Sequence, residues 1–60
     1  MTKNKFKAYL KVQKSGKVNM FDWRGVSSLS RGVLGKEDII DIMDNYTKYQ
    51  KEYGLTTENI

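Results

Sequence analysis

The 60-residue sequence contains neither cysteine nor histidine. Without cysteine the fold cannot be stabilised by disulfides, and without either residue the usual ligands of a structural zinc site are missing. The catalytic dyads and triads that depend on these side chains are excluded for the same reason. We therefore expect no cofactor, no metal site and no enzymatic activity.

Long apolar runs are also absent from the sequence. No stretch approaches the ~20 residues of a membrane-spanning helix. The N-terminal "MTKNKFKAYLKV" alternates lysines with apolar residues, so it lacks the hydrophobic region of a signal peptide. We expect a protein that does not associate with membranes, and the lack of cysteine favours a cytoplasmic location.

The chain is short enough to form only one small domain, residues 1–60. A chain of this length buries only ~60% of the surface that its unfolded form exposes. Domains of this size usually depend on disulfides, a metal, self-association or very regular helix packing. With the first two excluded, regular packing and homo-oligomerisation remain, and the sequence does not decide between them.

Residues 36–53 show the clearest pattern, an apolar stripe with helical spacing. The stripe consists of Ile39, Ile40, Ile42, Met43, Tyr46, Tyr49 and Tyr53. Glu37 and Asp38 occupy the first turn, where the helix dipole favours acidic side chains. Gly54 is predicted to end the helix in a left-handed conformation. We expect residues 55–60 to be a frayed tail.

The stretch "KSGKVNMFDW", residues 14–23, is typical of a turn followed by a helix start. Ser-Gly at 15–16 favours the turn, and Asn19 is predicted to cap the helix with Asp22 completing a capping box. Val18 and Trp23 have the spacing of a hydrophobic staple. We therefore favour a structural interpretation of this stretch over its interpretation as a binding site.

The two remaining segments are less regular. A helix from Met20 to around Leu34 is predicted to be short or broken near Gly32, because glycine and serine disfavour helix interiors. Residues 5–13 fit both a strand alternation and a helical stripe, and an isolated hairpin is marginal in water. We predict a mainly α fold, a small bundle of two or three short helices. The alternative is an N-terminal β-hairpin followed by two helices.

The charge of the chain, +4 overall, is unevenly distributed. Residues 1–34 contain eight basic residues and one acidic residue, a net charge of +7, whereas residues 35–60 carry −3. Basic residues interleaved with Phe6 and Tyr9 are typical of a nucleic-acid-binding strip. The candidate nucleic-acid-binding residues are Lys5, Lys7, Lys11, Lys14 and Lys17.

Acidic residues gather in the segment 37–44 as Glu37, Asp38, Asp41 and Asp44. Carboxylates bind hard cations, but one helix face cannot surround an ion without ligands from elsewhere. We therefore expect a solvated helix face and no metal site. The same acids argue against a helix-turn-helix, whose recognition helix would bring them to the phosphates.

Protein binding is the other function that the residue pattern favours. Phe21 lies opposite the apolar side of its predicted helix, so it is either exposed or in contact with a partner. We take Phe21, Trp23 and Arg24 as candidate partner-binding residues. The tyrosines of the C-terminal helix could also serve an interface, but we expect them in the core.

The segment SGxxNMFD resembles a group of very small uncharacterised proteins from phages and prophages of Gram-positive bacteria. The matching residues are Ser15, Gly16, Asn19, Met20, Phe21 and Asp22, with a weaker likeness at "IMDNY", residues 42–46. The resemblance implies a phage accessory protein in the cytoplasm of a bacterial host cell. Such a protein would bind a host or phage protein, for example to inhibit a host enzyme or defence complex. The resemblance implies no catalytic residues. The alternative function is a small nucleic-acid-binding accessory protein.

Overall fold

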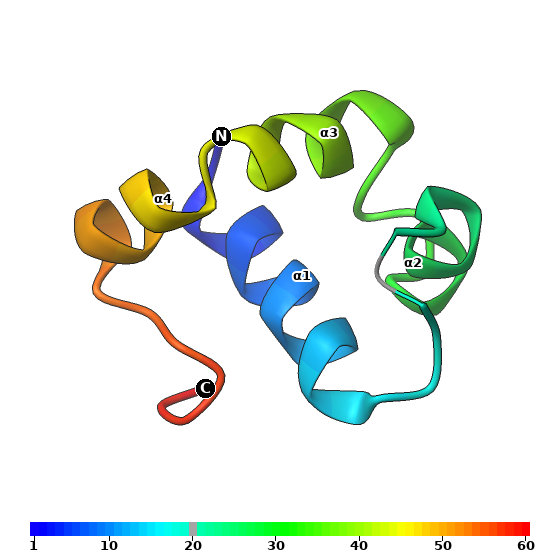
Figure 1. The fold of residues 1–60 in the computed structure, drawn as a ribbon, viewed down its shortest axis with the longest axis horizontal. Coiled ribbons are helices and arrows are strands. Elements are labelled where there is room, and N and C mark those ends of the chain that lie inside the picture. Colours follow the sequence, from blue (N-terminus) through cyan, green and yellow to red (C-terminus); the bar gives the residue numbers. More distant parts are fainter. Residues whose placement is uncertain (20) are drawn as a thin grey trace.

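Four short helices make up most of residues 1–19 and 21–60, which the computed structural model describes. They are α1 (Lys3–Ser15), α2 (Trp23–Leu29), α3 (Lys36–Asp44) and α4 (Tyr46–Tyr53). In Figure 1, α1 lies in the middle of the view and the other helices surround it. The described residues contain no strand. The mainly α prediction is confirmed, with four helices instead of two or three, and the β-hairpin alternative is wrong.

α1 is a helix because its buried positions follow the helical spacing and both of its ends are capped. Its buried residues are Phe6, Tyr9, Leu10 and Val12. Thr2 accepts a hydrogen bond from the Lys5 N–H at 3.2 Å, which caps the N-terminus. Gly16 ends the helix with φ of 65°, a left-handed conformation that glycine adopts without steric cost. The predicted turn at Ser-Gly is therefore confirmed.

α2 begins later than predicted, at Trp23. Asp22 is its N-cap, and the Asp22 carboxylate accepts the Arg24 N–H at 3.2 Å. Asn19 instead forms a turn: its side-chain oxygen accepts the Phe21 N–H at 2.9 Å, and its carbonyl accepts the Asp22 N–H at 2.9 Å. The capping role predicted for Asn19 is wrong, because Asn19 already directs its acceptors to this turn.

The end of α2 at Leu29 confirms the expectation of a short second helix, although the predicted start at Met20 lies outside the described residues. Val18 packs against Gly25 of α2 and does not act as a staple one residue before the cap. A Cβ atom at Gly25 would lie 2.7 Å from the Val18 Cγ2 atom, so a glycine is needed for this approach.

The predicted helix over 36–53 is two helices that meet at Asn45. The Asn45 backbone leaves the helical conformation at φ of −128°, and its amide group donates to the Asp41 carbonyl and carboxylate at 3.0 and 3.1 Å. Asparagine competes for helical hydrogen bonds in this way. Gly54 ends α4 with φ of 65°, as predicted.

The break at Asn45 places the α4 tyrosines around α1. The ring of Phe6, which is fully buried, lies 5.8 to 5.9 Å from the ring centroids of Tyr46, Tyr49 and Tyr53. The prediction that these tyrosines serve the core is confirmed. Leu55 and Ile60 also pack against this core, while the fraying of residues 55–60 stays a prediction.

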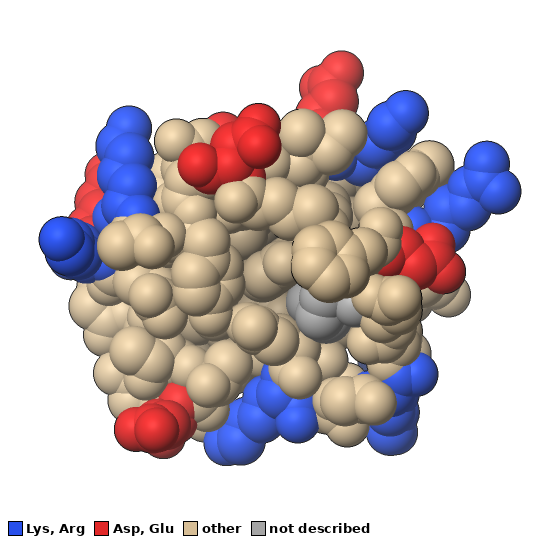
Figure 2. All heavy atoms as spheres, viewed as in Figure 1, with Lys and Arg blue, Asp and Glu red and all other residues tan. Residues whose placement is uncertain are grey.

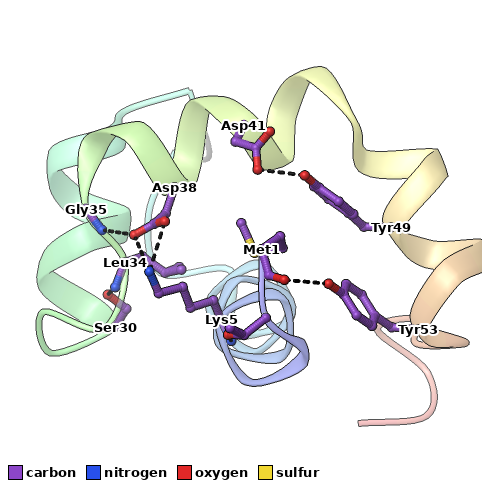
Figure 3. A network of polar contacts seen from close by, with 10 residues as sticks. Met1, Lys5, Ser30, Leu34, Gly35, Asp38, Asp41, Tyr49 and Tyr53 are labelled. Atoms are coloured by element: carbon purple, nitrogen blue, oxygen red, sulfur yellow. Dashed lines mark hydrogen bonds and ion pairs between the residues drawn. The ribbon is translucent and has the colours of Figure 1, made fainter.

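Polar contacts tie the helices together on the side of the molecule drawn in Figure 3. Lys5 Nζ lies 3.1 Å from an Asp38 carboxylate oxygen, and this ion pair joins α1 to α3. Asp38 also accepts the Gly35 N–H at 3.1 Å. These two donors, the Gly35 N–H first, hold the pKa of Asp38 below its ordinary value.

Candidate functional site

The most exposed large apolar residue described is Phe21, with 89% of its surface accessible. The turn at Asn19 holds its backbone in place. Phe21 forms one side of a groove of about 290 Å³, whose lining residues are Tyr9, Gln13, Phe21, Met43 and Tyr46. An aromatic ring is thus presented beside a mainly apolar depression.

Aromatic and polar side chains of the groove wall contact one another. The Tyr9 and Tyr46 rings meet edge to face at 6.2 Å, and the Tyr46 hydroxyl donates to Gln13 Oε1 at 2.9 Å. Burial, and then the neighbouring Tyr46, raise the pKa of Tyr9. A preformed groove costs less ordering on binding than a flexible one.

Trp23 and Arg24 lie on α2 and are not among the residues that line this groove. Trp23 is half-buried, and two cations flank its ring: Arg24 Cζ at 5.5 Å and Lys36 Nζ at 5.4 Å from the centroid. Such cation–π contacts hold both side chains near the indole. Phe21, Trp23 and Arg24 therefore form two neighbouring features of the chain, an aromatic groove and a cation–aromatic stack.

The predicted lysine strip is divided by the helical geometry of α1. Lys7, Lys11 and Lys14 are exposed and, together with Lys3, recur at the i, i+4, i+8 and i+11 spacing of one helix face. Lys5 lies on another face and pairs with Asp38. The strip therefore gains Lys3 and loses Lys5. Once residues 3–15 are known to be helical, this division follows from the sequence alone.

Lys17 belongs to a second basic feature, a depression of about 340 Å³ between the ends of α1 and α2. Its lining residues are Lys11, Val12, Ser15, Lys17, Ser28, Leu29 and Arg31. No sequence pattern indicated Ser28 or Arg31, because only the packing of α2 brings them to α1. Arg31 carries one signal of its own: it is the one described non-glycine residue with a positive φ, 57°.

Two of the four acidic residues of α3, Asp38 and Asp41, make structural contacts. Asp38 binds Lys5 and Gly35, and Asp41 accepts hydrogen bonds from Asn45 and from the Tyr49 hydroxyl at 2.7 Å. In the described part of the chain, acidic side chains form no group of three that could hold a metal ion. Asp38 thus joins α3 to α1 and Asp41 joins α3 to α4, whereas Glu37 and Asp44 are exposed.

The motif residues Ser15, Gly16, Asn19 and Asp22 shape the connection between α1 and α2. The Ser15 hydroxyl donates to the Val12 carbonyl at 2.6 Å, and the other three form the helix end, the turn and the N-cap described above. The motif residue Met20 lies outside the described residues. Phe21, which follows it, is not buried.

No protein-family model matches this sequence, and comparisons with curated proteins and with solved structures found no similar protein. In the described residues, no helix combines the length and the apolar character needed to cross a membrane. The resemblance to small phage proteins therefore remains a prediction based on its six residues.

Proposed function

We propose that this protein is a non-enzymatic accessory protein of the phage type that binds a host or phage protein through Phe21. The observation that carries this proposal is an 89% exposed phenylalanine in a turn where the Asn19 side chain accepts the Phe21 N–H. Burying a phenylalanine side chain is worth about 1.5–3 kcal/mol, a gain that this fold leaves unused. A partner that covers Phe21 would obtain it.

The chemistry of this surface defines the partner that it fits. Aromatic residues in well-packed pockets dominate binding energy at protein interfaces. The partner would offer an apolar pocket for Phe21 and an apolar side chain for the adjoining groove. The charge of +7 on residues 1–34 favours an acidic rim around that pocket. Figure 2 shows one face on which uncharged side chains fill most of the middle.

Inhibition of a host enzyme or defence complex is the mode of action that we propose for this contact. A protein of this size can block a larger partner by covering a functional surface, with no chemistry of its own. The proposal therefore needs one stoichiometric partner whose activity falls when it is bound.

The test compares Phe21→Ala with Val33→Ala, a matched truncation of another exposed apolar residue, 47% accessible. A tagged chain is used to isolate partners from a Gram-positive host, and the recovered protein is purified and titrated. We expect Phe21→Ala to weaken binding at least about thirtyfold, the size of a hot-spot loss of about 2 kcal/mol, at an unchanged melting temperature. Val33→Ala should bind as the natural chain does. Equal binding by all three chains would contradict the proposal.

Self-association is the competing explanation for the same surface. Because Phe21 and the groove adjoin, two copies related by a two-fold axis could each insert Phe21 into the groove of the other. Sedimentation of the natural chain and of Phe21→Ala over a range of concentrations separates the two explanations. A dimer that Phe21→Ala converts to a monomer would assign Phe21 to self-assembly and overturn binding to a host protein.

The second candidate function is nucleic-acid binding, and the lysine face of α1 favours it. Four exposed lysines on one face, Lys3, Lys7, Lys11 and Lys14, could neutralise up to four phosphates. Raising the salt concentration from about 50 to about 200 mM should then weaken binding by about a hundredfold. Lys7→Glu with Lys11→Glu should abolish it, whereas Lys48→Glu with Lys51→Glu on α4 is the control for net charge.

A further inference from the structure

We propose that the depression between α1 and α2 binds the phosphate group of a phosphate monoester. This site does not involve Phe21, so the inference stands independently of the proposed protein contact. Its cationic residues come from three places: Lys11 in α1, Lys17 in the following loop, and Arg31 after α2. No single segment of the sequence contains the site.

The electrostatics of the depression favour a dianion. Three basic side chains line it and no acidic one does. Among the described residues, none of the three forms an ion pair with a carboxylate. The three cations contribute +3. The helix dipoles place about −0.5 charge at the C-terminal end of each of α1 and α2, so the net charge at the depression is about +2. A phosphate monoester carries about −1.5 to −2 at pH 7, so it matches the site better than a phosphodiester with one charge.

The donors and the shape suit a phosphate that is joined to an organic group. Arg31 offers a guanidinium fork, Lys11 and Lys17 offer ammonium donors, and Ser28 offers a hydroxyl. A volume of about 340 Å³ is at the small end of the range for ligand sites and exceeds what a phosphate ion needs. Val12 and Leu29 supply an apolar wall for the rest of the ligand.

The C-terminal cap of α2 explains the backbone conformation of Arg31. The Arg31 N–H donates to the Ser28 carbonyl at 3.1 Å and the Gly32 N–H donates to the Ser27 carbonyl at 3.3 Å, the two hydrogen bonds of a Schellman motif. Arg31 has φ of 57° and Gly32 has φ of 81°, so both lie in the left-handed region. A glycine at position 31 would keep this cap and remove the guanidinium group. The structure places that side chain in the wall of the depression.

The experiment is an NMR titration of the full ¹⁵N-labelled chain with adenosine monophosphate, with adenosine as the matched neutral probe. We expect the monophosphate to shift the amide signals of residues 15–17 and 28–31, and adenosine to leave them unchanged. Equal shifts from both compounds, or shifts spread evenly over all lysines, would overturn the proposal.

Two variants identify the residues that hold the phosphate. Arg31→Gly keeps the turn and removes the guanidinium, so we expect at least about tenfold weaker binding of the monophosphate in a chain that is no less stable. Lys17→Ser should weaken binding similarly. Lys51→Ser removes one charge from α4 and should bind as the natural chain does. Unchanged binding by Arg31→Gly and Lys17→Ser would overturn the site.

A phosphate monoester could reach this site as a free small molecule or as the 5′ end of a nucleic-acid strand. A short single-stranded oligonucleotide is compared with and without its 5′-phosphate. If the phosphorylated strand binds more tightly than the mononucleotide, the site is assigned to strand ends. If the phosphorylated strand and the mononucleotide bind similarly, the site is assigned to small esters. If both strands bind equally and the mononucleotide does not bind, the depression has no preference for a monoester and the proposal fails.

Discussion

The two sides of this molecule differ in what their aromatic residues do. On the side of α4, three tyrosines surround the buried Phe6, and the Tyr49 and Tyr53 hydroxyls donate to Asp41 and to the Met1 carbonyl, both at 2.7 Å. On the side of α2, Phe21 is exposed and Arg31 is strained. One side satisfies its groups internally, and the other leaves an apolar ring and three cations available. We expect substitutions on the first side to change mainly stability, and we propose that the second side serves binding.

The largest expected effect separates the two phenylalanines. Phe6→Ala should lower the free energy of unfolding by about 3–5 kcal/mol, because it empties the centre of the core. A domain of this size has about 3–9 kcal/mol in total, so the variant should be largely unfolded. Phe21→Ala should change stability by no more than about 0.5 kcal/mol. Urea denaturation followed by circular dichroism measures both, and similar losses in the two variants would contradict the division.

Alkaline titration tests the tyrosine side. The hydrogen bond to Asp41 raises the pKa of Tyr49 to about 12. Because the folded state favours the neutral phenol, this contribution is complete below pH 10 and is lost as the pH rises towards 12. The melting temperature of the natural chain should therefore fall over this range more steeply than that of Tyr49→Phe. Parallel curves for the two chains would show that this hydroxyl does not support the fold.

Arg31→Gly tests the strain on the binding side, and here we expect stability to rise. The left-handed conformation costs a residue with a Cβ atom about 1–2 kcal/mol, and Arg31→Gly removes this cost. Glycine also raises the entropy of the unfolded chain, which offsets part of that gain in stability. The net gain should be up to about 1 kcal/mol in thermal denaturation. Gly16→Ala is the matched control at φ of 65°, and it should lose stability for the same reason. A less stable Arg31→Gly would show that Arg31 serves the fold.

The smallest expected effect concerns the ion pair between Lys5 and Asp38. Its side chains are 40% and 28% exposed, so the pair is worth about 0.2–1 kcal/mol. Since the pKa of Asp38 is lowered in the folded state, this stability is present above the unfolded pKa of about 4 and is lost as the pH falls through the folded value. Between pH 5 and pH 2, the natural chain should lose more stability than Asp38→Asn. An equal loss in both would mean that other carboxylates control acid unfolding.

The helical stripes of the core could be predicted because they depend on local periodicity. Phe6, Tyr9 and Leu10 share one face whatever packs against them, and the glycines at 16 and 54 end their helices through their own conformational freedom. The cap of α2 could not be predicted in the same way. Asn19 and Asp22 are both good N-caps, and local chemistry does not decide which of them starts the helix.

The candidate sites were only partly predictable. Phe21 could be proposed because it lies off the apolar face, but the groove beside it is built from α1, α3 and α4. The lysines of α1 were visible in the sequence, whereas the depression required Arg31 to lie near Lys11, twenty positions away. Packing of two helices decides such a distance, and no pattern within either helix contains it.

Composition alone excludes disulfides and every chemistry that needs cysteine or histidine, and spacing alone establishes which residues can share a helix face. These properties belong to single residues and to the geometry of one helix. The pairing of Lys5 with Asp38 and the meeting of Lys11, Lys17 and Arg31 depend on the tertiary structure. The physical reason is that each of these contacts requires helices distant in the chain to pack side by side. No pattern within a single helix specifies that packing.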